Sequence, residues 1–331
     1  MDALTTMLAE VRSAGALFGR NIMGSPWAIR FEDGAALTLV TMLRGAGWIV
    51  PDNGTPVRLE NRDRAIVSGT APFTVTDDIT VSTPPLYVLH SPDRCTTSSG
   101  EVVDPDELNL GIRTCGTRLD GDDVLLTGTY YVHGEVSGHL LGSLPPVLVV
   151  PHEYSASAHL DLTEAEIARD DPGQQAVLDR LLDLLLIATL RDWFAGPDGS
   201  PPPWYQAISD PTVGAALRAI HAHPERPWTV HSLAREAQIS RAALARRFTE
   251  LLGEPPIAYL TTWRLSLAAD LLRRTDSTVD TIARRVGYST SYALSAAFTR
   301  HFGVRPTEHR SRAHLASPVH ERHRPGPVGV H

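Results

Sequence analysis

The stretch that decides the fold reads SLAREAQISRAALARRFTELLG from Ser232 to Gly253, and it returns as TIARRVGYSTSYALSAAFTRHFG from Thr281 to Gly303. Each copy predicts a short apolar helix, a tight turn and a longer helix. Ala234 and Ala283 stand where the paired helices would cross, because only a small side chain permits that approach. The repeat predicts two units that read neighbouring stretches of one DNA face. A leucine and a phenylalanine anchor each longer helix: Leu244 and Phe248, then Leu294 and Phe298.

Charge is unevenly divided along the chain. The net charge is −8, yet residues from 211 onward hold 17 arginines against 9 acidic residues, a balance of +8. Residues 1–210 hold 13 arginines against 29 acidic residues, a balance of −16. A basic C-terminal part on an acidic body is typical of a phosphate-binding module joined to a different domain. All 30 basic residues are arginine, which genomic base composition explains more simply than function does.

Length and composition predict a globular protein with two domains. A chain of 331 residues with 42% hydrophobic content is long enough for two cores. No apolar run approaches the roughly 20 residues of a membrane span, and Asp2 and Glu10 precede the first arginine, unlike a signal peptide. Two cysteines fit a reducing compartment. We therefore expect a cytoplasmic, nucleoid-associated bacterial protein with no membrane partner.

The first two hundred residues predict a β-rich domain with flanking helices. Residues 1–20 have the apolar spacing of a short amphipathic helix. Between about 24 and 90, short alternating runs are separated by turn residues such as 52–54 (Asp-Asn-Gly), a pattern typical of an antiparallel sandwich or a small barrel. The polar residues 91–122 predict a long surface loop. An apolar helix from about Gly173 to Phe194 has enough apolar surface to pack on its own domain and on a second copy.

The domain boundary is predicted at a Pro- and Gly-rich linker. Thr229 is placed to cap the next helix, Ser277 with Asp280 has capping-box spacing, and Gly253 and Gly303 stand where the longer helices must end. A helix over about 256–272, roughly 24 Å long, would hold the two recognition helices about one DNA turn apart, roughly 34 Å. The predicted parts are a first domain over 1–195, a linker over 196–209, a DNA-binding domain over 210–312 and a disordered tail over 313–331.

Three strings in the C-terminal part resemble the AraC/XylS family of bacterial transcription activators. They are GEPPIAYLTTWRLSLAADLLR (253–273), IARRVGYST (282–290) and AAFTRHFGVRPTEHR (296–310). The resemblance covers about residues 210–312. It implies an all-α domain of two helix–turn–helix units joined by a linker helix, with both second helices in adjacent segments of the major groove. The partner it implies is double-stranded promoter DNA.

The resemblance also selects the residues that would contact DNA. On the first recognition helix the family-equivalent positions are Arg241, Ala242, Ala245 and Arg246, and Arg247 beside them is expected to face the DNA backbone. Arg246 is the best candidate for a bidentate guanine contact. On the second helix the equivalents are Ser291, Tyr292, Ser295 and Ala296; arginine is common at the last position in the family, so this unit is expected to read bases more weakly. The expected phosphate contacts are Ser289, Thr290, Arg300 and, on the linker helix, Arg264.

The N-terminal part resembles the cupin-like domain of a subset of AraC-family regulators. The strings that carry this resemblance include RSAGALFGR (12–20), PWAIRF (26–31) and LLGSLPPVLVV (140–150). It implies an α+β protein whose first domain is an antiparallel β-barrel. Phe73 stands where a histidine would be expected, and the metal-binding set of cupin enzymes is missing, so no metal, cofactor or catalytic residue is expected. The residues expected to line an effector pocket are Arg30, Trp27, Trp48, Tyr87 and Tyr131.

Cys95 and Cys115 leave three alternatives open. They could be inert thiols, a redox pair whose oxidation reshapes the loop, or half of a Cys₂His₂ zinc site with His90 and His133. The lack of short metal-ligand spacing favours the first. Redox or small-molecule signalling through the N-terminal domain stays the expectation for the whole chain.

The leading hypothesis is a homodimeric transcription regulator, an activator that engages RNA polymerase, and not an enzyme. A cupin-type enzyme with an auxiliary DNA-binding tail is the alternative. An architectural DNA-binding protein is a third possibility.

Overall fold

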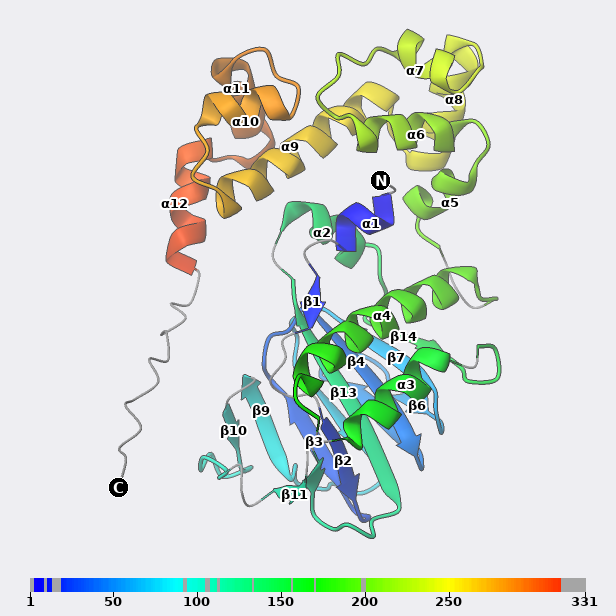
Figure 1. Cartoon of the computed structure of the whole chain (residues 1–331), viewed down its shortest axis with the longest axis vertical. Helices are drawn as coiled ribbons and strands as arrows, with labels where there is room; N and C mark the ends of the chain where they lie inside the picture. Colours follow the sequence, from blue (N-terminus) through cyan, green and yellow to red (C-terminus); the bar gives the residue numbers. More distant parts are fainter. Residues whose placement is uncertain are drawn as a thin grey trace. The chain divides into compact units, whose positions relative to one another are not determined.

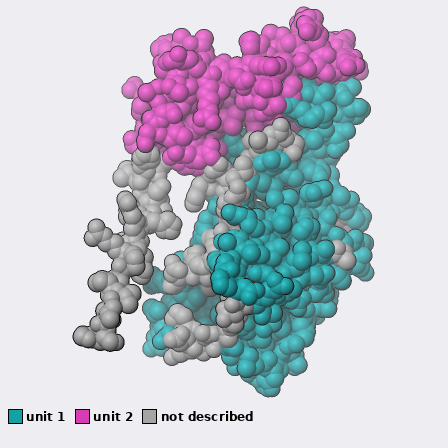
Figure 2. Space-filling model, in the orientation of Figure 1, with its two compact units in different colours: residues 1–218 teal, residues 219–331 magenta. Residues whose placement is uncertain are grey.

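The computed structural model describes residues 3–8, 11–13, 19–91, 94–104, 108–111, 114–132, 134–155, 157–169, 171–197 and 201–316. The chain forms two compact units, residues 1–218 and 219–331, coloured separately in Figure 2. Helix α6 (Val213–Ala222) runs through the boundary between them. Among the helices within the described ranges, none is both long and apolar enough to span a membrane.

Two β-sheets pack against each other in the first unit, and together with the helices they confirm the predicted α+β class (Figure 1). Most neighbouring strands are antiparallel; the parallel pairs are β12 (Thr114–Gly116) with β2 (Gly19–Met23) and β3 (Ala28–Phe31) with β9 (Tyr87–Ser91). The first sheet has the order β11 (Asn109–Gly111), β12 (Thr114–Gly116), β2 (Gly19–Met23), β13 (Asp123–Tyr131), β4 (Leu37–Arg44), β7 (Arg64–Ser68), β14 (Val147–Val150), with β1 (Arg12–Ser13) also on β13. The second has the order β10 (Arg94–Thr96), β9 (Tyr87–Ser91), β3 (Ala28–Phe31), β8 (Phe73–Thr76), β5 (Gly47–Pro51), β6 (Val57–Leu59).

Alternating side chains of both sheets fill the space between them. Val40 and Met42 from β4 meet Ile29 of β3 there, and all three are fully buried. Phe31 and Phe73 stack with ring centroids 4.7 Å apart, so the aromatic ring that replaces the expected histidine is part of the core. The centre of the sandwich is therefore a packed apolar interior.

Helices cover the other face of the first sheet. Strand β4 is buried on both faces, which predicts a covering layer, and α4 (Gln174–Ala195) supplies it. The hydroxyl of Tyr130 on β13 donates to the carbonyl of Leu182 on α4 at 2.8 Å. A Cβ on Gly128 would lie 3.0 Å from Leu182, so the helix sits close to the strand. The remaining helices of this unit are α1 (Ala3–Leu8), α2 (Glu135–Leu141), α3 (Ala158–Ile167), which packs on α4, and α5 (Pro203–Ser209).

Two predictions for the first unit are wrong. The helix expected over residues 1–20 ends at Leu8, because residues 12–13 pair with β13 and Gly19 begins β2. The loop expected over 91–122 contains β10, β11 and β12: β10 pairs with the preceding strand β9, β11 pairs with β12, and β12 pairs with β2, which is distant in sequence. Strands of three residues are too short to show alternation, and pairing with existing sheets overrides the polar composition.

The second unit is the predicted pair of helix–turn–helix motifs on a linker helix. Gly253 and Gly303 end the longer helices at φ 76° and 74°, as predicted, and Thr229 caps the first short helix. Ala234 and Ala283 are almost completely buried, at 2% and 0% exposure, as their crossing position requires. The motifs are α7 (Val230–Glu236) with α8 (Arg241–Leu252) and α10 (Val279–Arg285) with α11 (Ser291–Phe302), joined by α9 (Pro256–Arg274) and followed by α12 (Pro306–Ala316).

Three details differ from prediction. The cap of α10 is Thr278, which accepts from the backbone of Thr281, while Asp280 pairs with Arg284 instead of completing a capping box on Ser277. Helix α12 continues to Ala316, inside the predicted tail; residues 317–331 lie outside the described part. Helix α5 occupies the second half of the predicted linker, where a proline at its first position favours helix initiation.

Candidate nucleic-acid interface

The first helix–turn–helix motif presents one side of α8 to solvent. Ser240 caps α8 by accepting from the backbone N–H of Ala243 at 3.2 Å. Leu244 and Phe248 are fully buried and fix the rotation of the helix. Positions 241, 242, 245 and 246 recur at the spacing of neighbours on a helix surface. Of these, Arg241, Ala242 and Arg246 are exposed and Ala245 is half-buried.

The arginines of α8 are held only loosely. Arg246 is 79% exposed, and its Nε lies 3.7 Å from Glu250; Arg247 is 48% exposed and lies 3.6 Å from the same carboxylate. Exposed pairs of this kind contribute little to stability. The guanidinium of Arg246 can therefore exchange Glu250 for a phosphate or a base edge at little cost.

The second motif repeats this arrangement fifty residues later. Thr290 caps α11 by accepting from Ala293 at 3.1 Å, and Leu294 and Phe298 are buried as their counterparts are. Tyr292 is 84% exposed, the largest exposed aromatic side chain of this surface. Four of the other predicted contact positions have small side chains and are exposed or half-buried: Ser289, Ser291, Ser295 and Ala296. Arg300 is exposed near the end of the helix.

The turns of the two motifs are built from the same hydrogen bonds. In the first, Ile239 donates to the carbonyl of Ala234 at 3.0 Å; in the second, Tyr288 donates to Ala283 at 2.8 Å. The turn residue has positive φ in both copies, 55° at Gln238 and 87° at Gly287. Only glycine adopts that conformation without steric cost. Counting forty-nine residues back from Gly287 would have shown this correspondence in the sequence.

Arg264, a predicted phosphate contact, makes hydrogen bonds within the protein. Its Nε donates to the carbonyl of Pro224 at 2.7 Å, and its Nη2 donates to that of Arg226 at 2.6 Å. Burial lowers the pKa of its guanidinium, an effect opposed by Tyr288 and Glu225. The side chain is thus engaged with the segment before α7 and lies against the turn of the second motif. Arg264 therefore joins the two motifs through α9, and its contact with a DNA phosphate stays a prediction.

Aromatic packing further fixes the first motif to α9. His221 hydrogen-bonds to the hydroxyl of Tyr259 at 2.8 Å, and its ring lies 4.4 Å from that of Trp263. Tyr259 also meets Phe248 of α8 edge-on at 5.7 Å. Burial raises the pKa of the Tyr259 hydroxyl above its ordinary range, so it stays protonated. The recognition helix therefore rests on a rigid aromatic group that the sequence alone did not identify.

The five residues expected to line an effector pocket lie in different environments. Trp27 is fully buried, and its indole N–H donates to Asp123 at 2.8 Å; Tyr87 is buried in the same core and donates to Asn21 at 2.8 Å. Arg30 projects from the opposite face of β3. The charged and polar partners of the other three also differ: Arg30 pairs with Asp52 and Glu32, Trp48 lies under Arg58, and Tyr131 contacts Asp33 at 3.4 Å. The structure does not gather them around one cavity.

The cysteines are close enough to influence one another electrostatically. Both are free and half-buried, and burial, reinforced by Cys115, raises the pKa of Cys95 to about 11. Such a thiol is protonated near neutral pH and reacts slowly. His90 hydrogen-bonds to Thr96 at 2.9 Å, and His133 lies outside the described residues. Within the described ranges no three His, Cys, Asp or Glu side chains converge as a metal-binding group.

Comparison with known proteins places both units in described families. A family model described as Cupin matches residues 2–195, and one described as a helix-turn-helix domain matches residues 233–312. A Streptomyces lividans protein named as an AraC-like transcription regulator is 30% identical over 316 residues, covering 94% of this chain and 98% of the relative. The HTH-type transcriptional regulator AlkR of Acinetobacter baylyi is 34% identical over 204 residues, 60% of this chain and 66% of its own.

Several solved structures are similar to part of this chain. The DNA-binding domain of AdpA, in complex with a target DNA, is 34% identical, covers 32% of this chain and 96% of that chain, and has a TM-score of 0.31.

Proposed function

This chain belongs to the AraC-like transcription regulators and carries a cupin-type N-terminal domain. We propose that it reads promoter DNA through α8 and α11, under the control of a signal received by its first unit. DNA binding and regulation of transcription follow from the family. The observation that carries the proposed interface is the duplicated geometry: corresponding positions of α8 and α11 stay accessible while corresponding leucines and phenylalanines are buried.

We assign base contacts to Arg246 on α8 and weaker base reading to α11. An arginine can donate two parallel hydrogen bonds to a guanine edge, whereas Ala296 offers only a methyl group at the corresponding position. The hydroxyl side chains at the start of α11 and Arg300 are suited to phosphates. The second unit would then contribute register and affinity more than sequence discrimination.

Dimerisation and activation complete the proposal. Helix α4 exposes Val177 at 45% and Leu184 at 47%, and α3 exposes Leu162 at 57%, an apolar surface that a second copy would cover. Two copies would bring four helix–turn–helix motifs to repeated sites. Family habit favours activation, which requires contact with RNA polymerase at the promoter. Such a protein acts at the bacterial nucleoid, in the cytoplasm.

The enzyme alternative receives less support. The relatives are named transcription regulators. Phe73 occupies the position where a metal-binding histidine would be needed, and its ring stacks in the core. We propose that the first unit has no catalytic activity. Metal analysis of the purified protein tests this, because a stoichiometric metal that is lost together with an enzymatic activity would favour the enzyme.

The decisive experiment measures DNA selection by the full-length protein. Genomic fragments enriched by the protein should share a motif, and Ala242→Glu should abolish the enrichment, because a carboxylate on the exposed side of α8 would repel phosphates. Ala258→Glu is the matched control, since it places the same charge at an exposed position of α9. Enrichment that survives Ala242→Glu, or that shows no motif, would contradict the proposed interface.

The redox alternative is tested on the same fragments. If the cysteines transmit an oxidative signal, the double variant Cys95→Ser, Cys115→Ser should lose the effect of hydrogen peroxide on DNA affinity. An identical response in the wild-type protein and the double variant would exclude these thiols as the sensor.

A further inference from the structure

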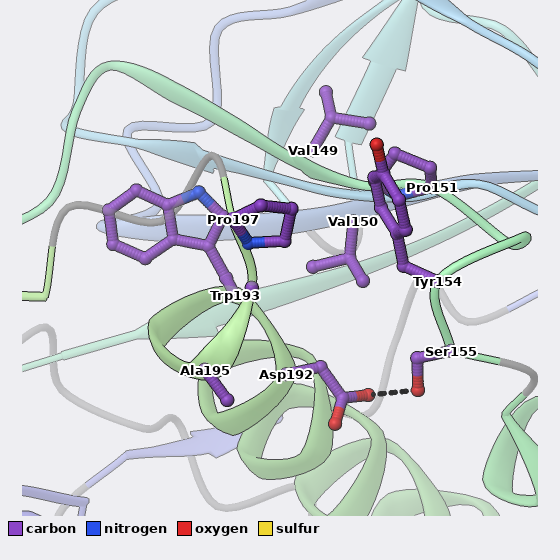
Figure 3. A pocket seen from close by; sticks show the side chains of 10 residues that line it. Val149, Val150, Pro151, Tyr154, Ser155, Asp192, Trp193, Ala195 and Pro197 are labelled. Atoms are coloured by element: carbon purple, nitrogen blue, oxygen red, sulfur yellow. Dashed lines mark hydrogen bonds between the residues drawn. The ribbon is translucent and has the colours of Figure 1, made fainter.

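A hollow in the first unit lies at the end of α4. It has a volume of about 290 Å³ and is bounded by the end of β14, the loop that carries Tyr154 and Ser155, and the last turn of α4 (Figure 3). This volume is at the small end of the range for ligand cavities, about 300 to 1,000 Å³. A larger hollow of about 900 Å³ adjoins it and shares Val149, Pro151 and Trp193 as lining residues.

A buried ion pair forms one edge of this hollow. Arg64 on β7 is completely buried, and its Nη2 donates to Oδ2 of Asp192 at 2.9 Å and to the carbonyl of Ser155 at 3.0 Å. The hydroxyl of Ser155 donates to the same Oδ2 at 2.8 Å, as Figure 3 shows. The Asp192 side chain remains 34% exposed. Both of these hydrogen bonds are to Oδ2, and no other described residue donates to Oδ1, so this oxygen can accept a hydrogen bond from a bound molecule.

The remaining walls are mostly apolar. Val149, Val150 and Pro151 come from β14 and its end, and Trp193 lines the hollow from α4. Because Arg64 already balances the charge of Asp192, the site as a whole is neutral. A neutral donor then gains a hydrogen bond to the carboxylate, whereas an ammonium group would lose hydration without finding an unbalanced charge.

We propose that this hollow is the effector site of the first unit, and that it takes a small, neutral, largely apolar molecule with one hydroxyl or N–H group that donates to Asp192. This inference rests on the proposed function for its regulatory meaning, but the binding itself does not depend on DNA. It moves the effector from the sandwich interior, which is filled by core side chains, to the outer side of the first sheet.

The position of the site supplies a route to regulation. Gly196 and Pro197 line it, and they are the residues through which the chain leaves α4 toward α5. The backbone N–H of Gly196 bonds to the carbonyl of Trp193, so the end of the helix and the wall of the hollow are one structure. A molecule packed against Trp193 would hold the start of this connection in a single conformation.

The test uses the full-length protein labelled with 5-fluorotryptophan, whose Trp193 resonance is assigned with Trp193→Phe. Three probes share one ring: benzyl alcohol is a neutral donor, toluene lacks the donor and benzylammonium is a cation. We expect benzyl alcohol to shift the Trp193 resonance in a saturable manner, with toluene and benzylammonium at least about tenfold weaker because each loses or misplaces the hydrogen bond. Amide exchange at Gly196 should slow when benzyl alcohol is bound.

Matched variants locate the binding. Ala195→Leu should abolish the response by filling the hollow, without removing either partner of the buried ion pair. Ala176→Leu makes the same change at an exposed position near the other end of α4 and should leave the response intact. Equal binding of all three probes, no saturable shift, or a response that survives Ala195→Leu would overturn the site. None of these results would affect the DNA-binding proposal, which is measured separately.

Discussion

Gly287 is the position where a single methyl group should disturb the link between the two DNA-binding motifs. Its φ is 87°, and a Cβ there would lie 2.6 Å from Nη2 of Arg264 and 2.9 Å from the carbonyl oxygen of Glu225. Gly287→Ala must therefore adopt a left-handed conformation and also displace the guanidinium from the carbonyls of Pro224 and Arg226. The left-handed conformation of the alanine costs about 1 kcal/mol of folding free energy. The loss of two hydrogen bonds adds about 1 kcal/mol each, for a total of about 3 kcal/mol.

Gly303→Ala is the matched control for this variant. Gly303 has φ 74°, and a Cβ there meets no atom within 4 Å, so the substitution should cost only the conformational term of about 1 kcal/mol. Urea unfolding of the full-length protein, followed at the 5-fluorotryptophan resonance of the buried Trp263, reports on this unit specifically. In an Arg264→Ala background the cost of Gly287→Ala should fall toward that of Gly303→Ala but stay above it, because the carbonyl oxygen of Glu225 still lies 2.9 Å from the added Cβ. Equal costs for the two glycine variants, or no coupling with Arg264, would refute the reasoning.

Four further predictions follow from single residues. Arg246→Ala should weaken binding to a selected site by about 1–3 kcal/mol and scrambled DNA much less; equal losses in a mobility-shift assay at fixed salt would make it a phosphate contact. Ala296→Arg should raise affinity and steepen the salt dependence by about one unit of slope, and an unchanged slope would contradict its placement facing DNA. Gln238→Gly should stabilise the protein by up to about 1 kcal/mol in urea unfolding, since φ is 55° there; a loss would contradict the duplicated turn. Burial in the folded protein raises the pKa of Cys95 from its ordinary value of 9 to about 11, so the stability that the neutral thiol contributes is complete below pH 9 and is lost between pH 9 and 11. Alkylation of Cys95 in a Cys115→Ser background should therefore be slow at pH 7.5, and fast labelling would contradict its burial.

Local patterns were sufficient where the chain repeats itself. The apolar spacing, the small residues at the crossings and the terminal glycines predicted both motifs, because a helix–turn–helix is specified by residues close in sequence. Caps were predicted less accurately: the residue that caps α10 is Thr278, and only the observed backbone separates it from Ser277. The short strands in residues 91–122 could not be predicted, since three residues are too few to show alternation and the partner of β12 is β2, far along the chain.

The sequence by itself determined the family, the charge division and the two recognition helices, because these depend on periodicity and residue type over a few helical turns. The tertiary structure alone decided which arginines are available. Arg246 remains exposed, whereas Arg264 is held by backbone carbonyls and Arg64 is buried against Asp192. The sequence alone does not distinguish these three arginines, because the solvation and the partners of each are set only when the chain folds; the partners of Arg264 and Arg64 come from segments 38 to 128 residues away.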